Sequence, residues 1–126
     1  MLLEAMVCMA LNVYHEARGE PFIGQVAVAE VVLNRIDDKR WPNDACGVIY
    51  QSQQFSWTLD ESKLSSTPKD IIAYNRAVQA VKYARSNRSM NATHYHHKDI
   101  IPLWSKHPRM DYLFTIENHK FYYEEL

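Results

Sequence analysis

Glycine and cysteine are both scarce in this chain of 126 residues, which contains three glycines and two cysteines. Three glycines are too few for a glycine-rich loop of the kind that cradles phosphates. Two cysteines cannot complete a four-ligand zinc site, and Cys8 and Cys46 do not form a C-x-x-C pair. The residues alone leave two alternatives, either two buried thiols or one disulfide between the first helix and the segment after the second.

The chain also lacks an excess of charge of one sign, because its formal net charge is -1 at pH 7. Without a basic field, we expect no nucleic-acid partner. No basic residue precedes the first apolar residues, Glu4 interrupts their run, and no other run is long enough to span a membrane. We therefore expect neither a signal peptide nor membrane insertion. Length and composition fit one globular domain, residues 1–126.

Helical periodicity dominates the first two thirds of the chain. Apolar residues at helical spacing predict helices at 2–18 and 22–36, and the second is so apolar that we expect it to be central and buried. Pro42 begins a short helix that runs to Tyr50, and a fourth helix has Thr67 as its N-cap. The expected buried stripes are Leu3, Val7, Ala10 and Tyr14 in the first helix and Ile71, Tyr74, Val78 and Val81 in the last.

Strand patterns follow the last helix. Residues 92–96, 111–116 and 119–123 are typical of strands, and the last two flank a turn at Glu117 and Asn118, which predicts a hairpin. Helices come first and a small antiparallel sheet follows near the C-terminus. This order predicts an α+β fold with a helical core.

The junction between the first two helices carries two carboxylates in opposite settings. Gly19 suits the end of one helix and Pro21 the start of the next. The helix dipole then raises the pKa of Glu16 and lowers that of Glu20. Carboxyl groups with pKa values pushed apart are typical of acid–base catalysis. The ordinary alternative is a helix–loop–helix with solvated carboxylates, in which Arg18 pairs with Glu16.

The residue types outside this junction favour glycan chemistry. Cleavage of a glycosidic bond needs a carboxyl group with a raised pKa that protonates the leaving oxygen. Sugar rings stack on aromatic side chains, and their hydroxyls bind amides and hydroxyls. The candidates for stacking are Phe55, Trp57, Tyr95 and Trp104, and those for polar contacts are Gln54 and Ser56.

Histidine offers a competing metal-site hypothesis. His94 and His96 would point to one face of a strand and need a third ligand, for which His119 is a candidate. The sequence lacks the His-Glu-x-x-His spacing of metalloproteases. We therefore expect structural or substrate-contacting histidines, with no metal and no cofactor. Nucleophilic catalysis is disfavoured because Cys8 lies within a helix and no G-x-S-x-G elbow is present.

Several segments together resemble the spore-cortex-lytic (SleB-type) cell wall hydrolase family. They include the E-A-R-G-E motif at 16–20 and cover nearly the whole chain in order. The segments are 10–21, 24–29, 32–35, 41–42, 46–51, 54–57, 92–96, 102–104 and 118–122. The resemblance implies a fold similar to lytic transglycosylases and lysozymes. It also implies cleavage of peptidoglycan between N-acetylmuramic acid and N-acetylglucosamine.

The same resemblance implies that Glu16 is the catalytic acid and that Glu20, with Arg18 and His119, supports it. Gln54, Phe55, Ser56, Trp57, His94, Tyr95, His96 and Trp104 are the expected substrate-binding residues. Spore enzymes of this type usually carry a signal peptide and a peptidoglycan-binding module, and neither is seen here. We therefore expect a stand-alone phage-type domain, an endolysin made in the cytoplasm and delivered to the cell wall. A trimmed exported bacterial domain is the alternative.

Our interpretation is a monomeric lytic transglycosylase that acts on peptidoglycan glycan strands. Glu16 protonates the glycosidic oxygen and then, as a carboxylate, takes the proton of the muramyl C6 hydroxyl, which closes a 1,6-anhydro ring. A hydrolytic muramidase is the first alternative and would need a second carboxylate, for which Asp60 and Glu61 are candidates. A non-catalytic glycan-binding or virion protein is the second.

Overall fold

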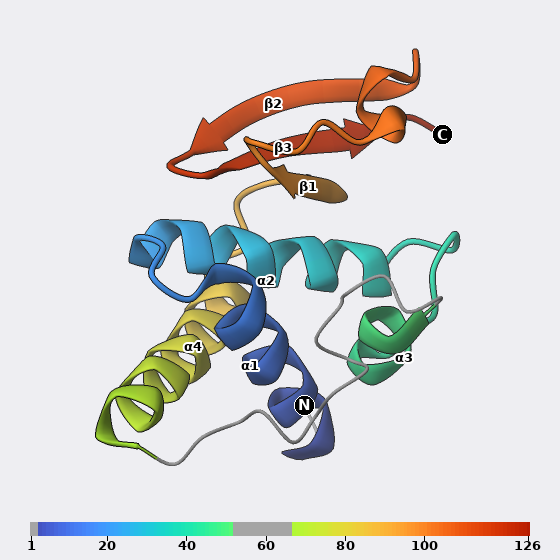
Figure 1. Cartoon of the computed structure of the whole chain (residues 1–126). Helices are drawn as coiled ribbons and strands as arrows, with labels where there is room; N and C mark the ends of the chain where they lie inside the picture. The colour runs from blue at the N-terminus through green and yellow to red at the C-terminus, as the bar shows by residue number, and fades with distance from the viewer. Residues whose placement is uncertain (1–2, 52–66) are drawn as a thin grey trace.

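A computed structural model describes residues 3–51 and 67–126, which form a helical part and a small sheet (Figure 1). The helices are α1 (Leu3–Ala17), α2 (Phe22–Ile36), α3 (Ala45–Tyr50) and α4 (Pro68–Ser86). The later elements are β1 (His94–His97), the 3-10 helix η4 (Leu103–Lys106), β2 (Met110–Ile116) and β3 (His119–Glu124). The predicted α+β fold is confirmed. Most helices and strands lie close to their expected limits, but α3 begins at Ala45 rather than at Pro42, and β1 begins at His94 rather than at residue 92.

Helix α2 separates the sheet from the other helices (Figure 1). Most of its side chains are buried, including the charged Glu30 and Arg35. Glu30 accepts hydrogen bonds from the backbone N–H groups of Ser89 and Met90, at 2.6 and 3.4 Å. These bonds satisfy a carboxylate that would otherwise be costly to bury. The central, buried position predicted for this helix is confirmed.

The expected buried stripe of α4 is wrong at its start. Ile71 is 50% exposed, and Tyr74 and Val78 are half-buried. The buried residues are Ala77, Ala80, Val81 and Ala84. Helix α4 therefore packs on α1 and α2 mainly through small side chains, which allow close approach of the backbones.

The first turns of α1 also differ from the expected stripe. Leu3 is 81% exposed and Val7 is exposed, whereas Ala10 and Tyr14 are buried as predicted. The remaining turns of α1 contact α2, α3 and α4. Because helices surround it there, α1 buries a broad face that includes the polar Asn12.

Cys8 and Cys46 form a disulfide between α1 and α3, with their Cα atoms 5.4 Å apart. The sequence left open whether these cysteines are two buried thiols or one disulfide, and the structure contains the disulfide. Helix α3 begins where Asp44 caps it, because the Asp44 carboxylate accepts a hydrogen bond of 2.7 Å from the N–H of Gly47. This cap fixes the helix that presents Cys46 to α1.

The sheet is antiparallel with the strand order β1-β3-β2. The β2–β3 hairpin turns at Glu117 and Asn118, as predicted, and Glu117 adopts a positive φ of 47°. In the pairing of β1 with β3, Tyr95 lies opposite Phe121, which is fully buried. The face of the sheet that carries Tyr95 and Phe121 is therefore the one that packs on the helices.

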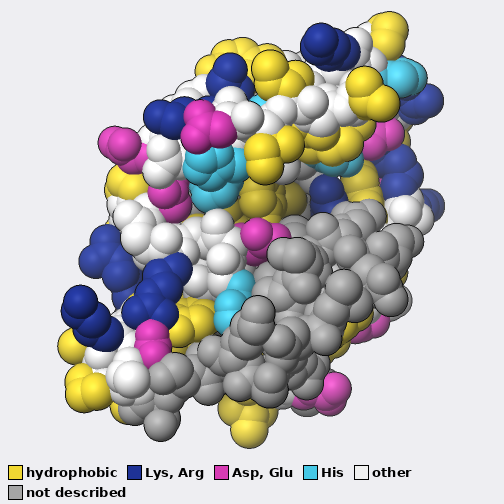
Figure 2. Space-filling model, viewed as in Figure 1, with side chains coloured by type: hydrophobic (Ala, Val, Ile, Leu, Met, Phe, Trp, Pro, Cys, Tyr) yellow, Lys and Arg dark blue, Asp and Glu magenta, His cyan; other side chains and the backbone are white. Residues whose placement is uncertain are grey.

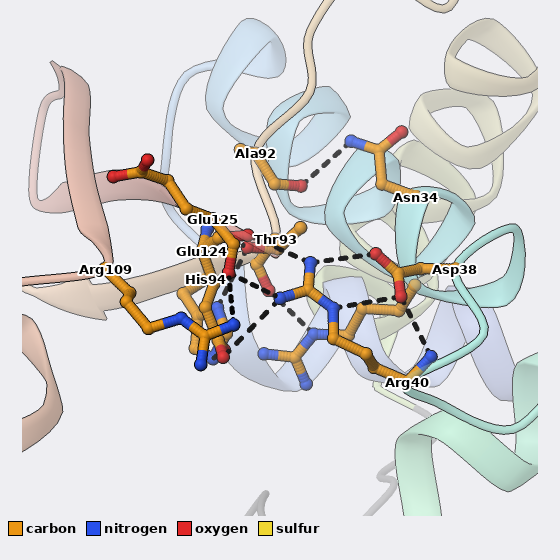
Figure 3. Close-up of polar contacts among 10 residues, drawn as sticks. Asn34, Asp38, Arg40, Ala92, Thr93, His94, Arg109, Glu124 and Glu125 are labelled. Carbon is orange, nitrogen blue, oxygen red and sulfur yellow. Dashed lines mark hydrogen bonds and ion pairs between the residues drawn. The ribbon is translucent and has the colours of Figure 1, made fainter.

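A polar network joins the sheet to the C-terminal end of α2 (Figure 3). Asn34 donates to the carbonyl oxygen of Ala92, and Arg35 donates to that of Thr93, at 2.9 and 2.7 Å. Arg40 bridges Asp38 and the carbonyl oxygen of Glu124, at 2.9 Å each. These contacts fix β1 and β3 over α2, and thus hold Tyr95 in place.

Candidate active site

Glu16 lies in the last turn of α1, and the chain turns away directly after it. Gly19 has a φ of 87°, and the N–H of Glu20 donates to the carbonyl oxygen of Ala17 at 3.0 Å. A glycine at this position ends the helix without strain. The helix end predicted from the sequence is therefore confirmed, and it leaves Glu16 half-buried at the surface of α1.

Burial raises the pKa of the Glu16 carboxyl to about 7. The direction agrees with the sequence-based expectation, and its cause is the loss of hydration on burial. A carboxyl group with a pKa near neutrality is protonated in a large fraction of molecules at pH 7. Glu16 therefore has the property that a general acid requires.

Arg18 does not pair with Glu16, which was the ordinary alternative for this junction. Its guanidinium binds the carboxylate of Asp70 on α4 and the hydroxyl of Tyr14. No ion pair to Glu16 is formed within residues 3–51 and 67–126. Nothing in that part of the molecule therefore offsets the effect of burial on the Glu16 pKa.

Tyr95 on β1 is the expected binding residue that the structure brings to Glu16. Burial raises the pKa of the Tyr95 hydroxyl well above its ordinary value, and the nearby Glu16 carboxyl raises it further. The charge of Arg35 and a hydrogen bond from the side chain of Asn12 act in the opposite direction. The Tyr95 hydroxyl therefore keeps its proton at neutral pH and lies beside the candidate acid as a neutral hydrogen-bonding group.

Glu20 is buried and joins the helix junction to the β2–β3 turn. Its carboxylate accepts hydrogen bonds from the backbone N–H and the side-chain amide of Asn118, at 3.1 and 2.8 Å. Nδ1 of His119 lies 3.4 Å from the same carboxylate. Burial acts to raise the pKa of Glu20, but the bonds from Asn118 and the neighbouring His119 hold it below its ordinary value. The two carboxyls of the junction thus have pKa values shifted in opposite directions, as predicted.

The other expected binding residues of the sheet lie on the opposite side of β1. His94 and His96 both contact the ring of Trp104, with centroid separations of 4.9 and 5.6 Å. Side chains alternate along a strand, so Tyr95 points to the other face. Burial, with the charges of Arg35 and Arg40, lowers the pKa of His94 to about 3. His94 is therefore neutral, and a substrate role for this cluster stays a prediction.

The remaining expected site residues lie outside the described residues. They are Gln54, Phe55, Ser56 and Trp57, together with the second-carboxylate candidates Asp60 and Glu61. Within the described ranges, no group of three or more His, Cys, Asp and Glu side chains is arranged to hold a metal ion. In the same ranges, no helix is both long and apolar enough to cross a membrane.

The sequence analysis missed Asn12 and Asp70 as neighbours of the site. Asn12 is completely buried in α1, beside Tyr95, and Asp70 fixes Arg18. A polar residue on an apolar helix face is itself a signal, because a buried amide is retained only where a partner satisfies it. There was no comparable signal in the sequence for Asp70, because an acidic residue in the first turn of a helix is common and does not indicate a partner such as Arg18.

The chain is similar to known cell wall hydrolases. The profile of the Cell Wall Hydrolase family matches residues 19–122. The spore cortex-lytic enzyme of Halalkalibacterium halodurans is 38% identical over 101 residues, which are 78% of this chain and 29% of that enzyme. The spore cortex-lytic enzyme of Bacillus cereus is 45% identical over 62 residues, or 49% of this chain and 24% of that enzyme. The chain thus spans less than a third of the relatives that it matches.

Two solved structures are similar over almost the whole chain. The catalytic domain of the germination-specific lytic transglycosylase SleB from Bacillus anthracis has a TM-score of 0.77 and 30% identity, covering 97% of this chain and 96% of that one. The catalytic domain of the Bacillus cereus SleB protein has the same TM-score of 0.77 and 31% identity, covering 96% and 91%. With a family match over most of its length and this shared fold, the chain belongs to the SleB-type cell wall hydrolase family.

Proposed function

We propose that the chain cleaves peptidoglycan glycan strands as a lytic transglycosylase and that Glu16 is its catalytic acid. The observation that carries the proposal is the half-buried Glu16 carboxyl, whose pKa is raised to about 7. The similar solved structure described as a lytic transglycosylase supports the reaction type. Tyr95 supports the role of Glu16, because it puts a neutral hydroxyl beside the carboxyl.

In this mechanism, Glu16 transfers its proton to the glycosidic oxygen as the bond from that oxygen to the muramyl C1 breaks. The departing sugar leaves as an alcohol, and positive charge develops at C1. The Glu16 carboxylate then takes the proton of the C6 hydroxyl while O6 bonds to C1. The product is a 1,6-anhydro sugar, no water is consumed, and Glu16 ends protonated for the next cycle.

A single catalytic carboxylate fits the surroundings of Glu16. Glu20 is the next acid along the chain, and its carboxylate is occupied by Asn118 and His119. A carboxylate with these partners and a lowered pKa is poorly suited to activate water as a base. The hydrolytic alternative therefore depends on Asp60 or Glu61, which lie outside the described part of the chain.

The place of action that we propose is the cell wall. The disulfide between Cys8 and Cys46 supports this, since such bridges persist in oxidising compartments outside the cytoplasm. Delivery as a phage endolysin and function as a monomer remain predictions from the sequence.

The test is digestion of purified peptidoglycan followed by mass spectrometry of the fragments. We expect fragments that end in 1,6-anhydro-N-acetylmuramic acid. Reducing ends, which are heavier by one water, would instead indicate a hydrolase. Binding to peptidoglycan without any release of fragments would contradict the proposal and favour a glycan-binding protein.

A further inference from the structure

A cavity lies where the α1–α2 junction, α4 and the β2–β3 turn meet. Its volume is about 540 Å³. The charged residues in its lining are Arg18, Glu20, Arg76 and Glu117. Because charges of both signs line one space, the cavity suits a ligand that carries both a carboxylate and a cationic or N–H donor group.

Gln25 gives an independent sign that this cavity binds a ligand. Its side chain lines the cavity and is only 4% exposed. Nε2 donates to the carbonyl oxygen of Glu20 at 3.3 Å, whereas Oε1 is buried and accepts no hydrogen bond from any described residue. A buried acceptor without a donor is costly. Oε1 is closed to solvent, so a ligand N–H would satisfy it once the Gln25 amide turns toward the cavity.

Arg76 is the cation best suited to bind a carboxylate here. Arg18 is already held by Asp70, whereas the Arg76 guanidinium lies over the ring of Phe22, 5.6 Å from its centroid. A guanidinium binds carboxylates through two parallel hydrogen bonds. Figure 2 shows Lys and Arg side chains gathered on the left of the viewed face, near α4 and the α1–α2 junction.

A short series of contacts leads from the candidate acid to this cavity. The Glu16 carboxyl lies near the Tyr95 hydroxyl and raises its pKa. The Tyr95 ring packs edge-on against the His119 ring, with centroids 5.5 Å apart. His119 in turn contacts Glu20, which lines the cavity. A peptide of four extended residues spans about 13 Å. Arg18 and Glu20, which line the cavity, follow Glu16 closely in the chain, so a peptide branch on a sugar bound at Glu16 would start near the cavity.

We infer that this cavity is a subsite for the stem peptide of peptidoglycan, the short peptide carried by its muramyl residues. Arg76 binds a peptide carboxylate, the Gln25 amide turns to accept a peptide N–H, and Glu117, which lines the same cavity, pairs with the free amino group of the diamino acid. The inference rests on the proposed function, because the peptide is attached to the glycan strand that Glu16 cleaves. The enzyme would then recognise the stem peptide in addition to the sugars of the glycan strand.

The test compares intact glycan strands with strands whose stem peptides an amidase has removed. For the wild-type chain, we expect a higher kcat/KM on the peptide-bearing strands. Arg76→Gln should lower the ratio of the two kcat/KM values about five- to tenfold, the size expected for one exposed charged hydrogen-bonding group. Arg85→Gln is the matched control, because Arg85 is exposed on the same helix and does not line the cavity.

A second measurement does not depend on cleavage. Titration calorimetry with the free tripeptide L-alanyl-γ-D-glutamyl-diaminopimelate should detect binding to the wild type and to Arg85→Gln, and weaker binding to Arg76→Gln. Equal ratios and equal binding for the two variants would overturn the subsite. Absence of cleavage on both kinds of strand, with tripeptide binding retained, would instead refute the proposed function and leave the peptide site standing.

Discussion

The side-chain amide of Asn118 donates a hydrogen bond of 2.8 Å to Glu20, although the two residues are 98 positions apart in the chain. Glu20 lies just beyond the end of α1, the helix that carries Glu16, and Asn118 lies in the β2–β3 turn. This bond therefore ties the sheet to the end of the helix that carries the candidate acid. It also fixes one wall of the cavity described above.

Glu20→Gln should lower the free energy of unfolding by about 1–3 kcal/mol at pH 7, the range for a buried hydrogen bond to a charged group. The effect should depend on pH. Because the folded-state pKa of Glu20 is lowered, its stabilisation is complete above its ordinary pKa and is lost as the pH falls through the folded-state value. The difference between wild type and variant should therefore shrink on acidification from pH 6 to pH 3.

Urea unfolding across this pH range measures that difference. The pKa of His119 is also lowered, so the wild type loses further stability as the pH falls below the ordinary histidine value of 6.5. Unfolding curves are therefore recorded for both the wild type and the variant at each pH. Asp111→Asn is the matched control, since Asp111 is exposed on the same hairpin. A stability difference for Glu20→Gln that stayed constant with pH would show that the carboxylate charge is irrelevant.

Glu16→Gln should reduce peptidoglycan cleavage by about two to four orders of magnitude, because the amide cannot donate the proton. Its effect on stability should have the opposite sign to that of Glu20→Gln. The raised pKa means that stability falls as the pH rises from the ordinary value of 4.5 to about 7. The variant should thus be more stable than the wild type at pH 8 and equally stable at pH 4.

Turbidity clearance and thermal unfolding at the two pH values check this pair of effects. Glu4→Gln is the control on the same helix, since Glu4 is exposed in the first turn of α1. Near-normal clearance by Glu16→Gln would remove Glu16 from the mechanism.

The limits of the elements were predictable because their signals are local. Thr67 accepts a hydrogen bond of 3.3 Å from the N–H of Asp70, and Gly19 ends α1, each as its residue type indicates. The packing faces were less predictable, since the choice between Ile71 and Ala77 depends on how closely α1 and α2 approach α4. The hydrogen bond between Asn118 and Glu20 could not be predicted from the sequence either, because only the complete fold brings these two residues together.

Tyr95→Phe should lower cleavage about tenfold or more while changing the melting temperature by only a few degrees. The ring keeps its contacts with His119 and Phe121, and only the hydroxyl between Asn12 and Glu16 is lost. The alkaline limb of the pH–activity profile should also move, because activity is lost as Glu16 deprotonates and the Tyr95 hydroxyl lies beside that carboxyl. Tyr112→Phe is the control on β2, where Tyr112 is 56% exposed. A large drop in melting temperature with unchanged cleavage would assign Tyr95 to the core alone.

Reduction of the disulfide should destabilise the chain without changing its catalytic groups. The bridge joins residues 38 positions apart, for which the chain-entropy model gives about 3 to 4 kcal/mol of stabilisation. The melting temperature of the wild type should therefore fall when dithiothreitol is added, and cleavage at low temperature should persist because Glu16 lies two turns along α1 from Cys8. The double variant Cys8→Ala, Cys46→Ala should melt at one temperature under both conditions. If the wild type melts at the same temperature with and without dithiothreitol, the bridge contributes nothing to the stability of the fold, which contradicts this prediction.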